Sequence, residues 1–347
     1  MRGSSRTRRS VRILAIPCLV AAFSAVAPSC SGPPGPEVVV YVSLDELYSR
    51  PILDAFERDT GIHVRAQFDT EAAKTIGLVN RLVAEKDRPR ADVFWNNEAA
   101  QSVRLRQEDI IEPYVSPNAA TIPAQYKDPD GYWTGFAARA RVIIYNTDLV
   151  GEPPRSIRDF AKPEWKGRVA MANPLFGTTA THAAALFALW GEEEAEAFFS
   201  ALKTNEVAVL PGNATVRDLV ARGEFAAGLT DTDDANGAVE DGFPVKWFVC
   251  DTDPGGTGAL IVPNTLMLVK GGPNPDAGRA LIDYLLRPEV EELLARSRSI
   301  QIPLHADASV KESIPAIVGL PTMNVSFDAV ARMLPVSAAS IQEEFLE

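Results

Sequence analysis

Short apolar runs alternate with amphipathic stretches along most of the chain. Residues 38–42 are all apolar or aromatic, which is typical of a buried strand. In residues 45–60, apolar side chains recur on one helical face, and Gly61 follows as a helix stop. The next expected elements are a strand at 62–66, a helix from 70 to 86 capped by Thr70, and a strand at 91–95. This alternation predicts parallel strands joined by right-handed crossovers, as in α/β proteins.

The second half of the chain repeats this alternation. We expect a strand at 141–145 that crosses between two lobes, and a strand at 225–230 that runs into an acidic loop at 231–234. Two strands either side of Pro263-Asn264 are expected to carry the chain back to the first lobe. Those strands are 259–262 and 266–269, and helices are expected at 192–203, 215–222, 276–286 and 289–296. A chain of 347 residues exceeds what one core usually fills, so two lobes are expected.

The first thirty residues differ from the rest. Residues 1–12 hold five arginines and no acid, and residues 13–27 are almost wholly apolar, which predicts a secretory signal peptide over residues 1–30. Ser29-Cys30 resembles a bacterial lipoprotein processing site, so lipidation of Cys30 is expected, with plain cleavage nearby as the alternative. The Pro- and Gly-rich residues 31–37 would then be a tether. Localisation in the periplasm or on the outer face of a membrane follows.

Charge and cysteine content exclude several classes of function. The net charge is −12, and without residues 1–30 it becomes −17, which makes nucleic-acid binding unlikely on electrostatic grounds. Cys18 leaves with the signal peptide, and Cys30 leaves or is acylated. Only Cys250 remains, so the mature chain can form no internal disulfide and no zinc site of cysteine and histidine ligands.

The loops after the expected strands are rich in carboxylates. In open α/β sheets, ligands bind beyond the carboxyl ends of the strands. Five such loops are expected, at 43–46, 69–71, 96–98, 173–179 and 231–234, and four of them contain Asp or Glu. An all-oxygen set suits a hard metal ion, and equally an organic cation with Trp95, Tyr48 or Tyr41 as an aromatic partner. The alternative for Asp231, Asp233 and Asp234 is a helix cap on a solvated loop.

Several segments, in this order and spacing, resemble a known family. They are residues 60–64 (TGIHV), 88–93 (RPRADV), 139–146 (RARVIIYN), 163–168 (PEWKGR), 258–260 (GAL) and 302–304 (IPL). The chain resembles the extracellular solute-binding proteins of bacterial ABC importers, in the branch that includes periplasmic ferric-iron-binding proteins. The resemblance covers nearly the whole mature chain.

The resemblance implies a type II-like periplasmic binding protein fold. Two α/β lobes are joined by crossover strands that act as a hinge, and they close on a solute in the cleft between them. Lobe 1 would comprise 38–137 and 259–300, and lobe 2 would comprise 138–258 and 301–347. It further implies a monomer that is not an enzyme and that delivers a small solute or metal ion to the permease subunits of an ABC importer.

The resemblance also implies where the solute binds. In ferric-binding relatives, a tandem tyrosine pair falls on Asp233 and Asp234 of this chain, and a first-loop histidine falls on Asp45. A third-strand carboxylate falls at Asn97 or Glu98. We therefore expect Asp45, Glu98, Asp233 and Asp234 to bind the solute, which is Fe³⁺ by resemblance. Secondary candidates are Asn97, Asp231, Arg139, Arg141, Asn173, Thr178 and Thr179.

Three other functions compete with metal binding. The same scaffold would take an organic cation, such as a thiamine-like, polyamine-like or aminophosphonate solute. A secreted hydrolase with paired carboxylates is a different class, but no Gly-x-Ser-x-Gly sequence, metalloprotease helix or phosphate-binding Gly loop supports it. A sensor domain without transport is the third alternative, which would need a signalling segment downstream of the binding domain.

Overall fold

The structure is a computed structural model that describes residues 35–69, 76–309 and 320–346. The expected signal peptide, Cys30, most of the expected tether and the expected cap Thr70 lie outside these residues. Strand β1 already begins at Glu37, so the last residue of the expected tether belongs to the sheet.

One half of the sheet contains three parallel strands, β2, β1 and β3, and helices cover both of its faces. The strand order is β2-β1-β3-β10-β5, and β10 runs antiparallel to its neighbours. Alternate residues of β1 point to opposite faces, so Val40 packs in one core cluster with α1 and α8, whereas Tyr41 packs in another with α2. The elements are β1 (Glu37–Val42), α1 (Glu46–Thr60), β2 (His63–Phe68), α2 (Ile76–Ala84), β3 (Val93–Asn96), α3 (Ala100–Gln107), β4 (Ile111–Glu112), β10 (Ile261–Val269), α8 (Pro275–Leu285) and α9 (Pro288–Arg296).

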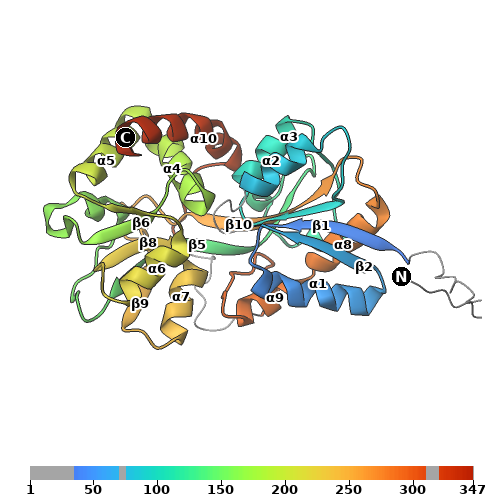
Figure 1. The fold of residues 1–347 in the computed structure, drawn as a ribbon, viewed down its shortest axis with the longest axis horizontal. Helices are drawn as coiled ribbons and strands as arrows, with labels where there is room; N and C mark the ends of the chain where they lie inside the picture. Colours follow the sequence, from blue (N-terminus) through green and yellow to red (C-terminus); the bar gives the residue numbers. More distant parts are fainter. Residues whose placement is uncertain (1–34, 70–75, 310–319, 347) are drawn as a thin grey trace, which may run out of the picture. The chain divides into compact units, whose positions relative to one another are not determined.

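The other half of the sheet is reached through strand β5 (Thr134–Asn146). Residues 134–140 of β5 pair with β10, and residues 141–146 pair with β8 and β9, so one strand runs through both halves (Figure 1). Strand β6 then lies between β8 and β7, parallel to both. The elements are β6 (Val169–Ala172), α4 (Gly177–Trp190), α5 (Glu192–Thr204), β7 (Ala208–Leu210), α6 (Asn213–Ala221), β8 (Ala227–Asp231), α7 (Thr232–Glu240), β9 (Val245–Val249) and α10 (Phe327–Ile341). Short turns of helix occur at Pro117–Ala119, Ala124–Tyr126, Ile157–Ala161, Pro163–Trp165 and Gln342–Leu346.

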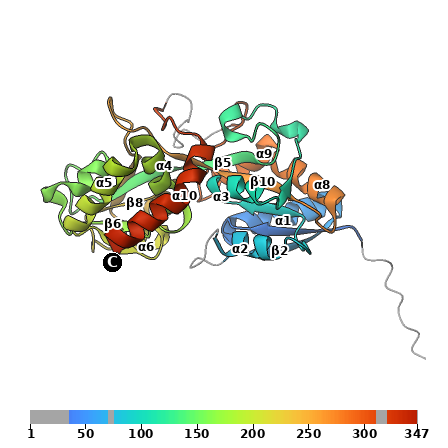
Figure 2. The same cartoon turned by 90° about the horizontal axis from the view of Figure 1, so that it is seen from above.

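The C-terminal helix α10 contacts both halves of the molecule. It packs along α4 and also touches α3, as Figures 1 and 2 show from two directions. Besides β5 and α10, segment 300–304 also lies where the two halves join. Ala138 of β5 exchanges backbone hydrogen bonds of 2.7 Å with Ile302 of this segment. Three stretches of chain therefore meet where the two halves join.

Several sequence predictions about individual elements are wrong. Pro263-Asn264 does not separate two strands, because β10 continues through it with a register shift against β5. The expected acidic loop is no loop, since Asp231 ends β8 and residues 232–234 form the first turn of α7. Strand β5 starts seven residues before the expected 141, and the expected loop 173–179 already turns into α4 at Gly177.

Candidate functional site

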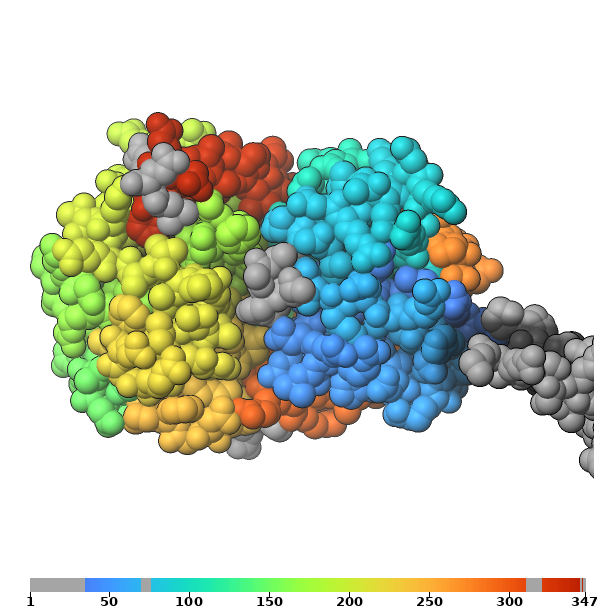
Figure 3. Space-filling view, viewed as in Figure 1, coloured from blue at the N-terminus to red at the C-terminus, as the bar shows by residue number. Residues whose placement is uncertain are grey.

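The ends of five strands and the starts of four helices surround a pocket of about 60 Å³. Nine of the eleven residues predicted for the solute site line it: Asp45, Asn97, Arg139, Asn173, Thr178, Thr179, Asp231, Asp233 and Asp234. In Figure 3, the yellow surface over α6 and α7 lies beside the blue surface of the first described elements. The residues chosen by the strand-end rule are therefore brought together around one pocket.

The junction of β8 and α7 concentrates negative charge. Carboxylate oxygens of Asp231, Asp233 and Asp234 lie within 4.8 Å of one another. Asp233 and Asp234 stand in the first turn of α7, where the partial positive charge of the helix N-terminus stabilises carboxylates. Among the residues that the structure describes, no other three His, Cys, Asp or Glu side chains converge in this way.

Asp231 is held by a buried arginine beneath the pocket. Arg141 is fully buried, and its Nη1 lies 2.6 Å from Asp231 Oδ1. The second carboxylate oxygen accepts hydrogen bonds from Thr178 Oγ1 at 2.6 Å and from Asn213 Nδ2 at 3.0 Å. Burial alone would raise the pKa of Asp231, but Arg141 and Arg139 outweigh it and lower that pKa. Asp231 is thus a buried carboxylate whose two oxygens are both engaged within the protein.

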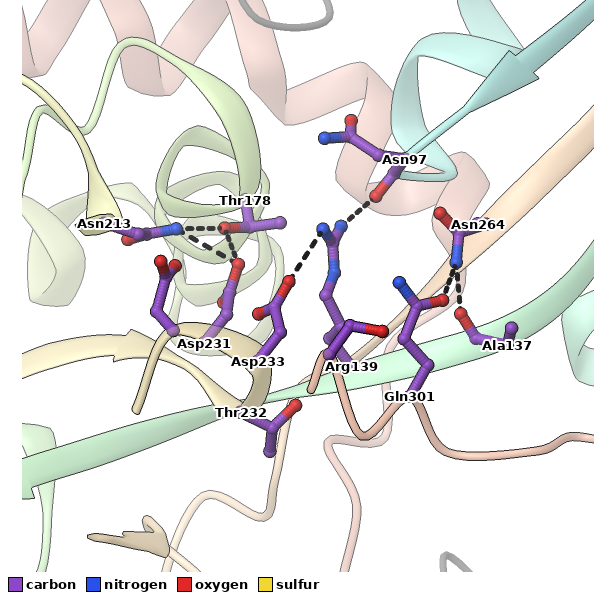
Figure 4. Close-up of polar contacts among 12 residues, drawn as sticks. Asn97, Ala137, Arg139, Thr178, Asn213, Asp231, Thr232, Asp233, Asn264 and Gln301 are labelled. Atoms are coloured by element: carbon purple, nitrogen blue, oxygen red, sulfur yellow. Dashed lines mark hydrogen bonds and ion pairs between the residues drawn. The ribbon is translucent and has the colours of Figure 1, made fainter. Parts of the chain in front are cut away.

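Arg139 spans the pocket floor. Its Nη2 donates to the carbonyl of Asn97 at the end of β3, and its Nη1 lies 3.8 Å from Asp233 Oδ2 (Figure 4). Burial disfavours the charged guanidinium, yet the nearby carboxylates, Asp233 first, leave the pKa of Arg139 raised. Asp45 and Asp234 also contribute to this shift. The acids and Arg139 therefore form one electrostatic unit around the pocket.

Glu98 does not join the other predicted ligands. Its carboxylate accepts the backbone N–H groups of Ala100 at 2.8 Å and Gln101 at 2.9 Å, and the hydroxyl of Thr181 at 3.0 Å. Burial raises the pKa of Glu98 despite these bonds. Glu98 lines a separate pocket of about 360 Å³ beside α10, not the pocket that holds Asp45 and Asp233. It bonds the first turn of α3 and ties that helix to α4.

Arg141 and Asn173 also make hydrogen bonds within the protein. Arg141 does not line the pocket. Its guanidinium donates hydrogen bonds to Asp231, Thr178, Thr179 and Asn213. Asn173 lines the pocket, and its Oδ1 accepts the backbone N–H of Leu175 at 2.9 Å.

The aromatic partners differ from those expected. Trp95 is fully buried against Phe136, and the Tyr41 hydroxyl donates to Glu85 at 2.8 Å, so neither ring faces the pocket. Tyr48 does not line the pocket, but burial first and then the charges of Asp233 and Asp45 raise its pKa to about 12. Phe176, which is 42% exposed, lines the pocket and was missed.

Asn213 was missed as well. It begins α6 after the three-residue strand β7. The apolar run 207–210 followed by Pro211-Gly212 is a usable signal for this strand end, but no strand was predicted there. Phe176 lies inside the predicted strand-end loop 173–179, but an apolar side chain there was not considered as a contact for the solute.

Comparison with known proteins decides the family. Residues 89–323 match the family model of the bacterial extracellular solute-binding proteins, which is more than half of the chain. The chain belongs to this family. The resemblance read from the sequence is thereby confirmed, including the branch of ferric-iron-binding proteins.

Curated relatives of this solute-binding protein are named for different solutes. It is 34% identical over 194 residues to the Fe(3+)-binding periplasmic protein of Serratia marcescens, a match that spans 55% of this chain and 56% of that relative. It is 25% identical to the major ferric iron-binding protein of Neisseria meningitidis, over 90% of this chain and 93% of that one. It is 26% identical to a putative 2-aminoethylphosphonate-binding periplasmic protein of Salmonella typhimurium, over 85% and 88%.

Solved structures confirm the two-lobed fold. Iron-bound HitA from Pseudomonas aeruginosa superposes with a TM-score of 0.79 at 21% identity, over 88% of this chain and 99% of that one. Apo ferric ion-binding protein A from Pasteurella haemolytica gives 0.78 at 23% identity, over 89% and 97%. At these identities the likeness concerns the fold alone. No helix in the described part of this solute-binding protein is long and apolar enough to cross a membrane.

Proposed function

We propose that this protein is the solute-binding component of an ABC importer and that it captures a cationic solute with Asp45, Asp233 and Asp234. The observation that carries the proposal is the convergence of carboxylates from the α7 turn and from Asp45 on one pocket. Carboxylates gathered at short range repel one another, and a bound cation offsets that repulsion. Asp231 has its oxygens engaged by Arg141, Thr178 and Asn213, so it supports the pocket from beneath.

A hard metal ion, with ferric iron first, is the leading candidate. Three carboxylates supply oxygen ligands of the kind that hard cations prefer. The Serratia and Neisseria relatives are both named as ferric-iron-binding proteins. No tyrosine or histidine stands among the described residues that line the pocket, so the ligands proposed for the metal here are carboxylates in place of phenolates.

A primary amine with an anionic group is the second candidate, and two residues favour it. A buried guanidinium 3.8 Å from Asp233 repels a metal ion, whereas it would pair with the anionic end of a zwitterion. Phe176 offers an exposed ring beside the acids, which suits an organic cation. An aminophosphonate has both ends, and the Salmonella relative is named for such a compound.

Export and delivery belong to the same proposal. The protein would act in the periplasm or on the outer face of a membrane, as a monomer, and would pass its solute unaltered to the permease subunits. Lipidation at Cys30 stays a prediction, and the mass of the mature N-terminal peptide from the native host would test it. Recovery of a chemically changed solute after incubation would support the hydrolase alternative instead.

The identity of the solute can be tested directly. Native mass spectrometry of protein purified from its own compartment weighs the bound solute, and calorimetric titration with ferric nitrilotriacetate and with 2-aminoethylphosphonate separates the two candidates. Copurification of a purely anionic solute, with no response to either titrant, would contradict a cation site.

The carboxylates can be tested with a charge-matched control. Asp45→Asn with Asp234→Asn removes two charges from the pocket and leaves Asp233 beside Arg139. Charged hydrogen bonds contribute about 1.5–3 kcal/mol each, so affinity for the titrant that binds should fall at least tenfold. Asp276→Asn with Glu193→Gln removes two carboxylates from the first turns of α8 and α5 and should leave affinity unchanged. Equal losses in both pairs would indicate a general effect of net charge.

A further inference from the structure

A second buried charge pair lies behind the junction of the two halves, away from the solute pocket. His305 Nδ1 is 2.7 Å from Glu291 Oε2, and the two residues are 4% and 0% exposed. The other ring nitrogen, Nε2, lies 2.9 Å from the backbone carbonyl oxygen of Asn118. The proposed solute site uses none of these groups.

The partners of this pair fix its protonation state. A backbone carbonyl only accepts hydrogen bonds, so His305 Nε2 must donate to Asn118. Glu291 accepts backbone N–H groups from Ala137 at 2.6 Å, Leu304 at 3.0 Å and His305 at 2.9 Å, which is the pattern of an ionised carboxylate. His305 Nδ1 therefore donates as well. A ring that donates from both nitrogens is the imidazolium cation, so this contact is a buried ion pair.

The pair holds a distorted point in β5. Ala137 has φ of 43°, a left-handed conformation that costs a residue with a side chain free energy. It sits where the register of β5 against β10 shifts, opposite Pro263 and Asn264. Its N–H donates a hydrogen bond to Glu291. Its carbonyl accepts a hydrogen bond from Asn264 Nδ2, and Figure 4 shows this second bond together with Gln301. Two residues further along β5 stands Arg139, on the floor of the solute pocket.

Glu291 thus collects three stretches of chain at one point. They are β5 through Ala137, helix α9 through Glu291 itself, and segment 302–305 through the Leu304 and His305 amides. The charged groups on the elements packed around His305 are Asp307 on its own segment, Glu292 and Arg296 on α9, Asp283 on α8, and Lys127 after the 124–126 turn.

We propose that the His305–Glu291 ion pair is a pH-sensitive clamp on the β5 crossover at Ala137. It holds β5, α9 and segment 302–305 together while His305 carries its proton, and it loosens them when that proton is lost. The clamp regulates the hinge of the solute-binding function proposed above, but its test needs no solute.

The direction of the pH dependence follows from linkage. Burial lowers the pKa of His305, but the hydrogen bonds to Glu291 and Asn118 outweigh it and raise that pKa above 6.5. A histidine whose pKa is higher in the folded state contributes stability in full below its unfolded pKa of about 6.5. That contribution is lost as pH rises through the folded pKa. Loosening is therefore expected above neutral pH, not below it.

The wild-type protein tests the protonation state without any variant. Nitrogen-15 chemical shifts of the imidazole rings, followed against pH on solute-free protein, should show both His305 nitrogens protonated at pH 6.5. They should show titration only at higher pH. The chain has three histidines, and burial lowers the pKa of His182 to about 3, so that ring stays neutral throughout. Titration of His305 at or below pH 6.5 would overturn the proposal.

Amide exchange tests the clamp itself. After correction for the intrinsic pH dependence, protection of the Ala137, Leu304 and His305 amides should fall across the titration of His305. The fall should be about tenfold for each unit by which the pKa of His305 exceeds its unfolded value. His305→Gln should remove this pH dependence, whereas His63→Gln, which changes the exposed pair with Glu57, should keep it. A pH-independent protection of these amides in the wild type would show that the pair is structural only.

Discussion

Two strand ends in this protein look alike in sequence but use their acids in opposite ways. Strand β8 ends in Asp231 and leads into an acidic first turn of α7, while strand β3 ends in Asn96 and is followed by Glu98 before α3. At β8, the pocket is lined by Asp233 and Asp234. At β3, the carboxylate of Glu98 folds back onto the first amides of its own helix.

The difference arises from what each helix start already has. Asp231 occupies the position before α7 but makes no side-chain hydrogen bond to that helix, because Arg141 engages it from β5. Among the residues that the structure describes, no arginine forms an ion pair with Glu98, and its carboxylate accepts hydrogen bonds from two backbone amides and the Thr181 hydroxyl. At these two strand ends, the acid lines the solute pocket where the helix after it does not bind the carboxylate, and it lies outside that pocket where the helix does.

The largest effect on stability is expected from removing Arg141, the partner of the aspartate that ends β8. Arg141→Met should destabilise the protein by about 3–5 kcal/mol, because it leaves Asp231 buried without its cation. Chemical denaturation would measure the loss. The control is Arg155→Met, whose pair with Asp253 is exposed and should contribute less than about 1 kcal/mol. Similar stabilities for both variants would mean that Asp231 does not depend on Arg141.

A rescue experiment sharpens this prediction. Adding Asp231→Asn to Arg141→Met removes the unpaired charge and should recover part of the lost stability. If the double variant is less stable than Arg141→Met alone, the loss comes from packing around the arginine and not from an isolated carboxylate.

Much of the first half of the fold could be predicted from the sequence. Residues 38–42 form a strand buried between two helical layers, so a continuous apolar run marks it clearly. Helix α1 ends where Gly61 predicts, because Gly61 adopts φ of 70° and its N–H bonds the carbonyl of Glu57. In such elements the apolar pattern and the tertiary environment agree.

The second half of the fold was harder to predict from the sequence, for physical reasons. Residues 134–140 contain Gly135, Arg139 and three small alanines, so the buried start of β5 has no apolar run. Helix α4 is apolar on nearly all sides and shows no contrast between faces, so no helix was assigned to 177–190. For the site, strand ends and family resemblance pointed to aspartates that the structure brings together around one pocket. The placement of Glu98 failed because its role depends on α3 starting at Ala100.

A moderate effect on stability is expected from changing Glu98, the acid that follows β3. Glu98→Gln keeps an oxygen acceptor but loses charge-assisted bonds to Ala100, Gln101 and Thr181, so it should cost about 1–3 kcal/mol at pH 8. Solute affinity should stay within a few-fold of wild type, because Glu98 does not line the solute pocket. A large loss of affinity with unchanged stability would restore Glu98 as a ligand.

The pH dependence of the same variant gives a further check. Burial raises the pKa of Glu98 in the folded protein, so the folded state binds a proton more readily than the unfolded state. Stability contributed at this residue should therefore rise as pH falls from above the folded pKa toward 4.5, and Glu98→Gln should lack that rise. Melting curves of wild type and variant that run parallel across this window would contradict a raised pKa.

The smallest effect is expected at the contact between Glu98 and α4. Thr181→Val preserves the shape of the side chain but removes the hydroxyl that donates to Glu98 at 3.0 Å, while the two backbone amides still satisfy the carboxylate. The cost should be about 1 kcal/mol, and the pKa of Glu98 should rise further, because a bond that favours the charged form is gone. Thr204→Val is the matched control, since its hydroxyl bonds a carbonyl at the exposed end of α5.

Because Thr181 and Glu98 tie α4 to α3, small-angle scattering of the solute-free protein should show a larger radius of gyration for Thr181→Val than for Thr204→Val. Identical scattering would mean that this hydrogen bond stabilises α3 without holding the two halves together.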